Sequence, residues 1–163
     1  MNEKKKSSGK RNRAAGHAYE LRVVKVFQKI YPHVRTSRSV SRTRDAQKVD
    51  LAHVDEHVNG RFPYNVQCKS VTGGVVYPKL LKQMPVEPGI MNVIFHKYTS
   101  KTEFKTGGSN FRTVGEFAIC RAVDFMELIR HKEAYRILFN YYEFLPEIQQ
   151  KEIQDKFIEK GLA

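Results

Sequence analysis

The feature that most constrains the fold of this chain lies within residues 49–70. It consists of two short apolar runs separated by a turn-rich interval. Asp50 ends the first run, and the second, Tyr64 to Ser70, carries Gln67 and Lys69 two positions apart. Side chains alternate between the two faces of an extended strand, so Gln67 and Lys69 should project from the same face. If Asp50 comes from a neighbouring strand, a carboxylate, an amide oxygen and an ammonium group meet at one place.

The rest of the pattern predicts an α/β (α+β) domain with a central mixed β-sheet flanked by helices. Helical periodicity covers residues 14–31, and a strand and bend follow over residues 33–41. Beyond residue 70 we expect these elements: a short helix over 77–84, a buried strand over 90–98, a polar hairpin or loop over 99–113, a strand over 116–122, a helix opened by a capping box at Asp124, its aromatic continuation over 134–144, and a last helix from Pro146 to Gly161.

The first of these helices carries a carboxylate on its apolar face. When the sequence is projected at 100° per residue, Val23, Val26 and Ile30 share an arc, and Glu20 falls inside it. A buried carboxylate is costly unless a partner stabilises it. Glu20 is therefore either a glutamate at the rim that reaches solvent or part of a polar site beneath the helix.

Positive charge is concentrated in the first third of the chain. Residues 1–48 hold 14 basic and 3 acidic side chains, whereas residues 49–163 hold 15 and 14. We expect residues 1–13 to form a flexible basic arm and residues 14–163 a single domain, with its core in 14–121 and C-terminal helices in 124–163. Such asymmetry indicates a polyanionic partner, with nucleic acid favoured over an anionic membrane surface; a merely solvated tail is the alternative.

A segment rich in arginine and serine precedes Asp50. Guanidinium forks and serine hydroxyls are common donors to phosphate oxygens, and the segment contains no carboxylate before Asp45 to absorb its charge. We expect it to bind a nucleic-acid backbone, although a solvated loop is the simpler alternative. The candidate DNA-binding residues are Arg35, Arg38, Ser39, Ser41, Arg42 and Arg44.

Several other classes of protein are disfavoured. No apolar run approaches the roughly 20 residues that span a bilayer, and the charged N-terminus lacks the apolar segment of a secretory signal. We therefore expect a cytoplasmic protein without membrane contact. Cys68 and Cys120 are interpreted as buried free thiols, and the six histidines share no spacing typical of a metal site.

Taken together, these residues resemble the PD-(D/E)XK nuclease superfamily. The likeness rests on a helix with an inward glutamate, a strand ending in Val49-Asp50-Leu51, and a strand carrying Gln67-Cys68-Lys69. Within that superfamily, the Gly16-His17-Ala18-Tyr19-Glu20 start of the helix and the Arg/Ser segment are similar to the archaeal-type Holliday junction resolvases and their phage relatives. The likeness spans roughly residues 14–121. Most members carry Glu or Asp where this chain has Gln67.

This resemblance implies a restriction-endonuclease-like core and a magnesium-dependent endodeoxyribonuclease that resolves four-way DNA junctions. The implied catalytic residues are Glu20, Asp50, Gln67 and Lys69. Mg²⁺, or Mn²⁺ in its place, would be held by Glu20, Asp50, Gln67 and the backbone carbonyl of Cys68. Host cytoplasm would be the location if the chain is phage-encoded, which its compactness would suit.

Partners and alternatives follow from the same reasoning. Symmetric cuts across a junction need two active sites, so we expect a homodimer on branched DNA. The aromatic residues of 135–144 would then be core or a dimer surface. Two other functions stay open: another DNA endonuclease of this fold, restriction-type or general, and a non-catalytic nucleic-acid-binding protein in which Gln67 marks decay of a nuclease site.

Overall fold

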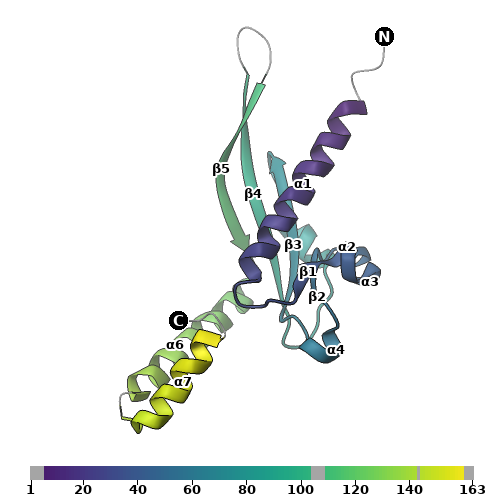
Figure 1. Ribbon diagram of the computed structural model, residues 1–163. Coiled ribbons are helices and arrows are strands. Elements are labelled where there is room, and N and C mark those ends of the chain that lie inside the picture. The colour runs from purple at the N-terminus through teal and green to yellow at the C-terminus, as the bar shows by residue number, and fades with distance from the viewer. Residues whose placement is uncertain (1–5, 104–108, 143, 160–163) are drawn as a thin grey trace, which may run out of the picture.

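The computed structural model describes residues 6–103, 109–142 and 144–159, and its centre is a three-stranded mixed sheet (Figure 1). Strand β3 (Tyr64–Thr72) pairs in parallel with β4 (Met91–Glu103), which pairs antiparallel with β5 (Ser109–Ile119). Parallel neighbours need a crossover connection, and helix α5 (Tyr77–Gln83), with a proline in its first turn, supplies it. The predicted mixed sheet flanked by helices is confirmed.

Helix α1 (Lys6–Phe27) covers one face of this sheet. Its buried residues Tyr19, Val23 and Val24 belong to the same core cluster as Val66 and Cys68 of β3. The helix begins eight residues before the predicted start at residue 14. Residues 6–13, which we expected to be flexible, are helical in spite of Gly9 and Asn12, since four of the eight residues are Lys or Arg, which favour helix, and no proline interrupts them. Residues 1–5 of the predicted arm lie outside the described residues.

A small antiparallel pair, β1 (Val34–Thr36) and β2 (Leu51–His53), lies beside β3. Between its strands are two short helices, α2 (Ser37–Val40) and α3 (Arg42–Ala46), and α4 (Glu56–Asn59) follows β2. The strand predicted over residues 33–41 is therefore only three residues long. The chain turns away because Ser37 N–H donates to the Asp50 carbonyl at 2.7 Å, and Ser41 then caps α3.

The segment predicted as a polar hairpin or loop over residues 99–113 is mostly strand. β4 continues to Glu103, and β5 already begins at Ser109, with residues 104–108 outside the described part of the chain. A register shift at Tyr98 and Thr99 interrupts the ladder between the two strands. The β-branched residues Thr99, Thr102, Thr113 and Val114 favour strand, and the polar residues around them suit two exposed strands that pair with each other.

Two helices complete the chain and project beyond the end of β5 (Figure 1). They are α6 (Ala122–Tyr142) and α7 (Glu147–Glu159). The predicted capping box at Asp124 is wrong, since α6 already includes Asp124, whose carboxylate accepts two hydrogen bonds from Arg121 at 2.7 and 2.9 Å. The predicted stop at Gly161 lies outside the described residues. None of the helices described is both long enough and apolar enough to cross a membrane.

Candidate active site

Asp50 is fixed beside β3 by three hydrogen bonds. Its N–H donates to the Val66 carbonyl at 2.7 Å, and its own carbonyl accepts from Ser37 at 2.7 Å. Its carboxylate Oδ2 accepts the Cys68 N–H at 2.6 Å. Both of its neighbours in the chain are buried, which leaves the backbone no freedom to withdraw the side chain. The aspartate is thus held against the strand that carries the Gln-x-Lys pair, as the sequence predicts.

The electrostatics of Asp50 show which charges surround it. Burial, and to a smaller extent the nearby Glu20 carboxylate, raise the pKa of Asp50 to about 6. The hydrogen bond from Cys68 N–H and the positive charges of Lys69 and Arg38 oppose this increase in pKa. Two carboxylates and two cations therefore lie within electrostatic reach of one another, drawn from α1, β3 and the Arg/Ser segment.

Glu20 lies on the inward face of α1, as predicted, with 8% of its surface exposed. Its Oε1 accepts a hydrogen bond from Arg38 Nη2 at 3.1 Å, and its Oε2 lies 3.3 Å from His17 Nδ1. This carboxylate and Asp50 also both raise the pKa of the buried Cys68 thiol. Glu20 therefore belongs to the Asp50 site and is not a rim glutamate that reaches solvent.

Gln67 is buried without a partner for its amide oxygen. It is 2% exposed, and its Oε1 finds no hydrogen-bond donor in the described part of the chain. An unpaired buried acceptor costs about 1–3 kcal/mol, so native proteins rarely keep one. Strand alternation places Gln67 with Asn65 and the half-buried Lys69 on the face opposite Val66 and Cys68.

The predicted magnesium ligands fit a hard cation by chemistry. Asp50 and Glu20 supply carboxylate oxygens, Gln67 an otherwise unpaired amide oxygen, and all of these are ligands that Mg²⁺ accepts. The Cys68 carbonyl points to the same strand edge as the N–H that binds Asp50, because both groups of a strand residue face one neighbour. Among the described residues no group of three or more His, Cys, Asp or Glu side chains could hold a metal, and the proposed set contains only two.

Three of the predicted DNA-binding residues use their side chains in hydrogen bonds with nearby backbone groups. The Arg35 guanidinium donates to two carbonyls of its segment at 2.7 and 2.8 Å. Ser39 Oγ donates to the carbonyl three residues earlier at 2.7 Å, and Ser41 Oγ accepts the Arg44 N–H at 3.3 Å. These side chains shape the segment, whereas Arg38, beside Asp50, and Arg42, the first residue of α3, are exposed.

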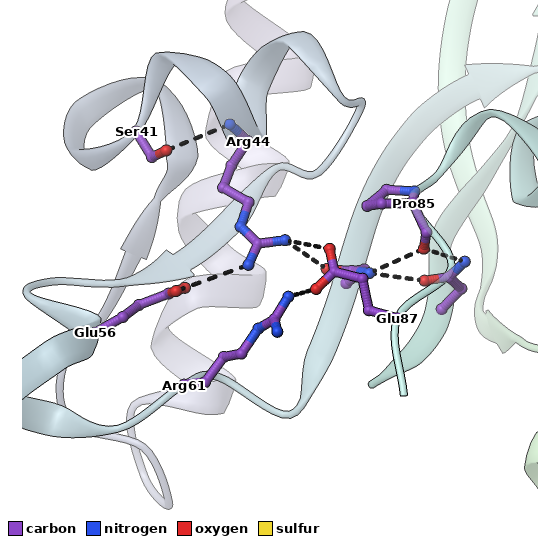
Figure 2. A network of polar contacts seen from close by, with 8 residues as sticks. Ser41, Arg44, Glu56, Arg61, Pro85 and Glu87 are labelled. Carbon is purple, nitrogen blue, oxygen red and sulfur yellow. Dashed lines mark hydrogen bonds and ion pairs between the residues drawn. The ribbon is translucent and has the colours of Figure 1, made fainter. Parts of the chain in front are cut away.

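Arg44 is enclosed by carboxylates, contrary to the expectation that local salt bridges could not absorb its charge. Figure 2 shows its guanidinium facing Glu87, with Nη1 2.8 Å from Oε1, and facing Glu56, with Nη2 3.7 Å from Oε2. Arg61 pairs with the second oxygen of Glu87. Both acids follow Arg44 in sequence and reach it only in the folded chain. Arg44, 16% exposed, holds the segment to the sheet and offers little to a ligand.

Sequence reasoning missed the polar network below this arginine. Asn65 Nδ2 donates to Asn92 Oδ1 at 3.0 Å and to the Pro85 carbonyl at 3.2 Å, which joins β3 to β4 and to the turn that precedes β4. These partners are 20 or more residues apart, so no local spacing marks them. The only signal was the presence of two asparagines at buried strand positions, Asn65 and Asn92.

The geometry thus places Glu20 and Lys69 within electrostatic reach of Asp50, whereas Gln67 projects from the face of β3 opposite Val66 and Cys68, which pack on α1. Searches against protein-family models, characterised proteins and solved structures find no match to this chain. The functional conclusion therefore rests on the residues of the site.

Proposed function

We propose that this protein is a magnesium-dependent endodeoxyribonuclease with a restriction-endonuclease-like core that cuts branched DNA at four-way junctions. The observation that carries the proposal is the position of Asp50 against β3, where its carboxylate accepts the Cys68 N–H at 2.6 Å and where Glu20, Lys69 and Arg38 are close enough to interact with it electrostatically. Strongly shifted carboxylates surrounded by specific charged partners are typical of functional sites.

The order of the elements supports the same reading. α1 carries the inward glutamate, Asp50 immediately precedes β2, and β3 carries Gln67 and Lys69. This is the arrangement of motifs on which the resemblance to PD-(D/E)XK nucleases rests. The unpaired Gln67 oxygen adds an independent observation, because a bound cation would satisfy it.

The chemistry divides between a bound cation and the chain's own groups. Bound by Glu20, Asp50, Gln67 and the Cys68 carbonyl, Mg²⁺ would polarise the scissile phosphate and lower the pKa of a coordinated water. Lys69 would then offset negative charge that grows on the phosphate in the transition state. The Cys68 N–H keeps the Asp50 carboxylate in one orientation, so these groups need little reorganisation when substrate binds.

DNA would approach the site along its basic side. Arg42 is exposed and could contact backbone phosphates, and Arg38, which is exposed beside Asp50, could do so in exchange for or alongside its ion pair with Glu20. Arg11 and Arg13 are exposed on the N-terminal half of α1, the helix that carries Glu20. Phosphate contacts position a duplex without reading its sequence, which suits recognition of shape. Paired cuts across a junction would require a homodimer.

The experiment is a cleavage assay with Mg²⁺ on a synthetic four-way junction, beside a linear duplex and a single strand of matching sequence. We expect junction cutting that EDTA abolishes and that Asp50→Asn abolishes while junction binding persists. Asp55→Asn is the matched control, because Asp55 is an exposed acid with a left-handed backbone (φ 48°) that asparagine also tolerates.

The outcomes separate the alternatives. Equal cutting of all three substrates would favour a general or restriction-type DNA endonuclease of the same fold. Junction binding without any cutting, in Mg²⁺ or in Mn²⁺, would favour the non-catalytic binding protein, which Gln67 in place of an acid also favours. Absence of both cutting and binding would overturn the proposal.

A further inference from the structure

The C-terminal helix pair exposes far more apolar surface than a solvated helix tolerates. On α6, Leu138 is 69% exposed and Tyr141 is 62% exposed. A helix with apolar residues all around its circumference is normally buried on more than one side. Other large apolar side chains exposed on the same pair are Val123, Phe125, Met126, Leu128, Ile129, Tyr135, Ile137, Phe139, Phe144, Ile148 and Ile158.

Only one face of α6 is used against α7. Tyr135 meets the Phe157 ring edge-on, with 5.8 Å between centroids, and the Tyr142 hydroxyl donates to the Gln150 carbonyl at 2.6 Å. A second stripe lies about one third of the way round the helix. It consists of Ala134, Ile137, Leu138 and Tyr141, which have the three- and four-residue spacing of a helix-packing seam. We call these four residues the outer stripe.

The solvent-accessible surface of the chain is large enough to include a dimer interface. The chain exposes 12612 Å², whereas a compact monomer of 18.9 kDa exposes roughly 8,300 Å². Obligate homodimers bury roughly 2,000–5,000 Å² in total, so the share of each subunit fits within this surplus. The helix pair, which projects beyond the end of β5 (Figure 1), contributes its exposed apolar side chains to this surplus.

Charge indicates what kind of partner fits. Residues 122–159 contain eight acidic and five basic side chains, whereas residues 1–48 carry the positive excess. An acidic, apolar surface repels a nucleic-acid backbone and suits protein. A two-helix pair can complete its core by packing on an identical pair across a two-fold axis, which makes a four-helix bundle.

We propose that the outer stripe of α6 is the interface through which two copies of this chain form a homodimer, by pairing their α6–α7 helices into a four-helix bundle. The interface lies at the end of the molecule away from the basic half of α1, so it leaves the DNA-binding side of each subunit free (Figure 1). The proposal rests on exposed surface and not on the chemistry at Asp50, so each can fail without the other.

The test is the mass of the full chain in solution by sedimentation velocity and by light scattering. At tens of micromolar we expect a mass of about 38 kDa, twice 18.9 kDa. Leu138→Glu combined with Tyr141→Glu should halve that mass, because charges would be buried in the interface. Both side chains are exposed in the single chain, so the change removes no core contact and should leave the circular dichroism spectrum of the folded protein intact.

Val58→Glu is the matched control, since Val58 is 74% exposed on α4 and lies outside the helix pair. It should keep the dimer mass. A monomeric wild-type chain would overturn the proposal, and so would a double variant that remains dimeric. If the wild-type chain forms a larger assembly and the double variant forms it too, the chains associate through another surface. That result would also overturn the proposal.

Discussion

Polar groups are buried around Asp50, whereas large apolar groups are exposed to solvent along α6. Gln67 Oε1 is buried without a donor, and the pKa of Asp50 is raised by burial. On α6, Leu138 and Tyr141 contribute most of their surface to solvent. Each arrangement costs the isolated chain stability, so each indicates a binding partner that compensates for it.

The two regions differ in the chemistry of that partner. The Asp50 site offers hard oxygen ligands and cations, which suit a divalent ion and a phosphate. The helix pair offers large apolar and aromatic side chains, which suit another protein surface. Substitutions should therefore separate the two: changes in the first region alter chemistry and stability, and changes in the second alter assembly.

The largest expected effect is on catalysis, through Lys69. Lys69→Ala should slow single-turnover junction cleavage about 10²–10³-fold, because it removes a positive charge beside the reacting phosphate. Junction affinity, measured by fluorescence anisotropy, should change little, and the dimer mass should not change. Lys97→Ala is the control, because Lys97 projects from the opposite face of the adjacent strand. An equal loss of cleavage rate in both variants would show that Lys69 has no specific role in the active site.

The second prediction concerns the free energy of unfolding and compares one ion pair from each region. Arg44→Ala should lower the free energy of unfolding by about 2–3 kcal/mol, because it breaks a largely buried pair with Glu87 and leaves Glu56 without its cation. Arg136→Ala, which removes an exposed pair with Glu133 on α6, should cost at most about 0.5 kcal/mol. Urea unfolding at one fixed protein concentration measures both. Similar costs would contradict the structural role assigned to Arg44.

The third effect is a pH dependence that follows from Asp50. Its carboxyl ionises near pH 3.8 in the unfolded chain and near pH 6 in the folded one, so the unfolded state loses its proton first. This group therefore stabilises the fold below about pH 4, and that contribution is lost as the pH rises through 6. Asp50→Asn should equal wild type near pH 4 and exceed its free energy of unfolding by about 2 kcal/mol at pH 8, without added metal.

Urea unfolding of both proteins across this pH range isolates Asp50 together with its coupling to Glu20, because carboxylates that do not interact with Asp50 contribute equally to each. Asp55→Asn again serves as the control and should show no such difference. If the wild-type protein were the more stable of the two at pH 8, the carboxylate would have stronger favourable partners than the structure gives it.

Much of the site could be predicted because its signals are local. The 3.6-residue period placed Glu20 on the inward face of α1, and the two-residue period placed Gln67 and Lys69 together. The same projection was wrong for Val26, which is exposed near the end of α1, and for Ile30, which is exposed in the turn after the helix ends at Phe27. Periodicity shows which face is apolar but not how far the neighbouring layer reaches.

The rest depended on contacts between distant segments. Arg44 was expected to face solvent or phosphate, since no carboxylate precedes Asp45 in its segment. Glu56 and Glu87 reach it only because α4 and the turn before β4 fold against α3. In the same way, the sequence indicates that α6 and α7 are helices, and only the fold reveals that Ile137, Leu138 and Tyr141 of the outer stripe stay largely exposed.

The smallest expected effect concerns Gln67, where binding and stability should oppose each other. Gln67→Met keeps the length of the side chain and removes the unpaired oxygen, so the free energy of unfolding without metal should rise by about 1 kcal/mol. The same variant should lose the additional stability that Mg²⁺ gives the wild-type protein, because a ligand has been removed. Thermal unfolding with and without Mg²⁺ measures both changes. A variant that is less stable and still responds fully to Mg²⁺ would show that Gln67 serves the core of the fold and not the cation, and the contrast between the two regions would then rest on Asp50 alone.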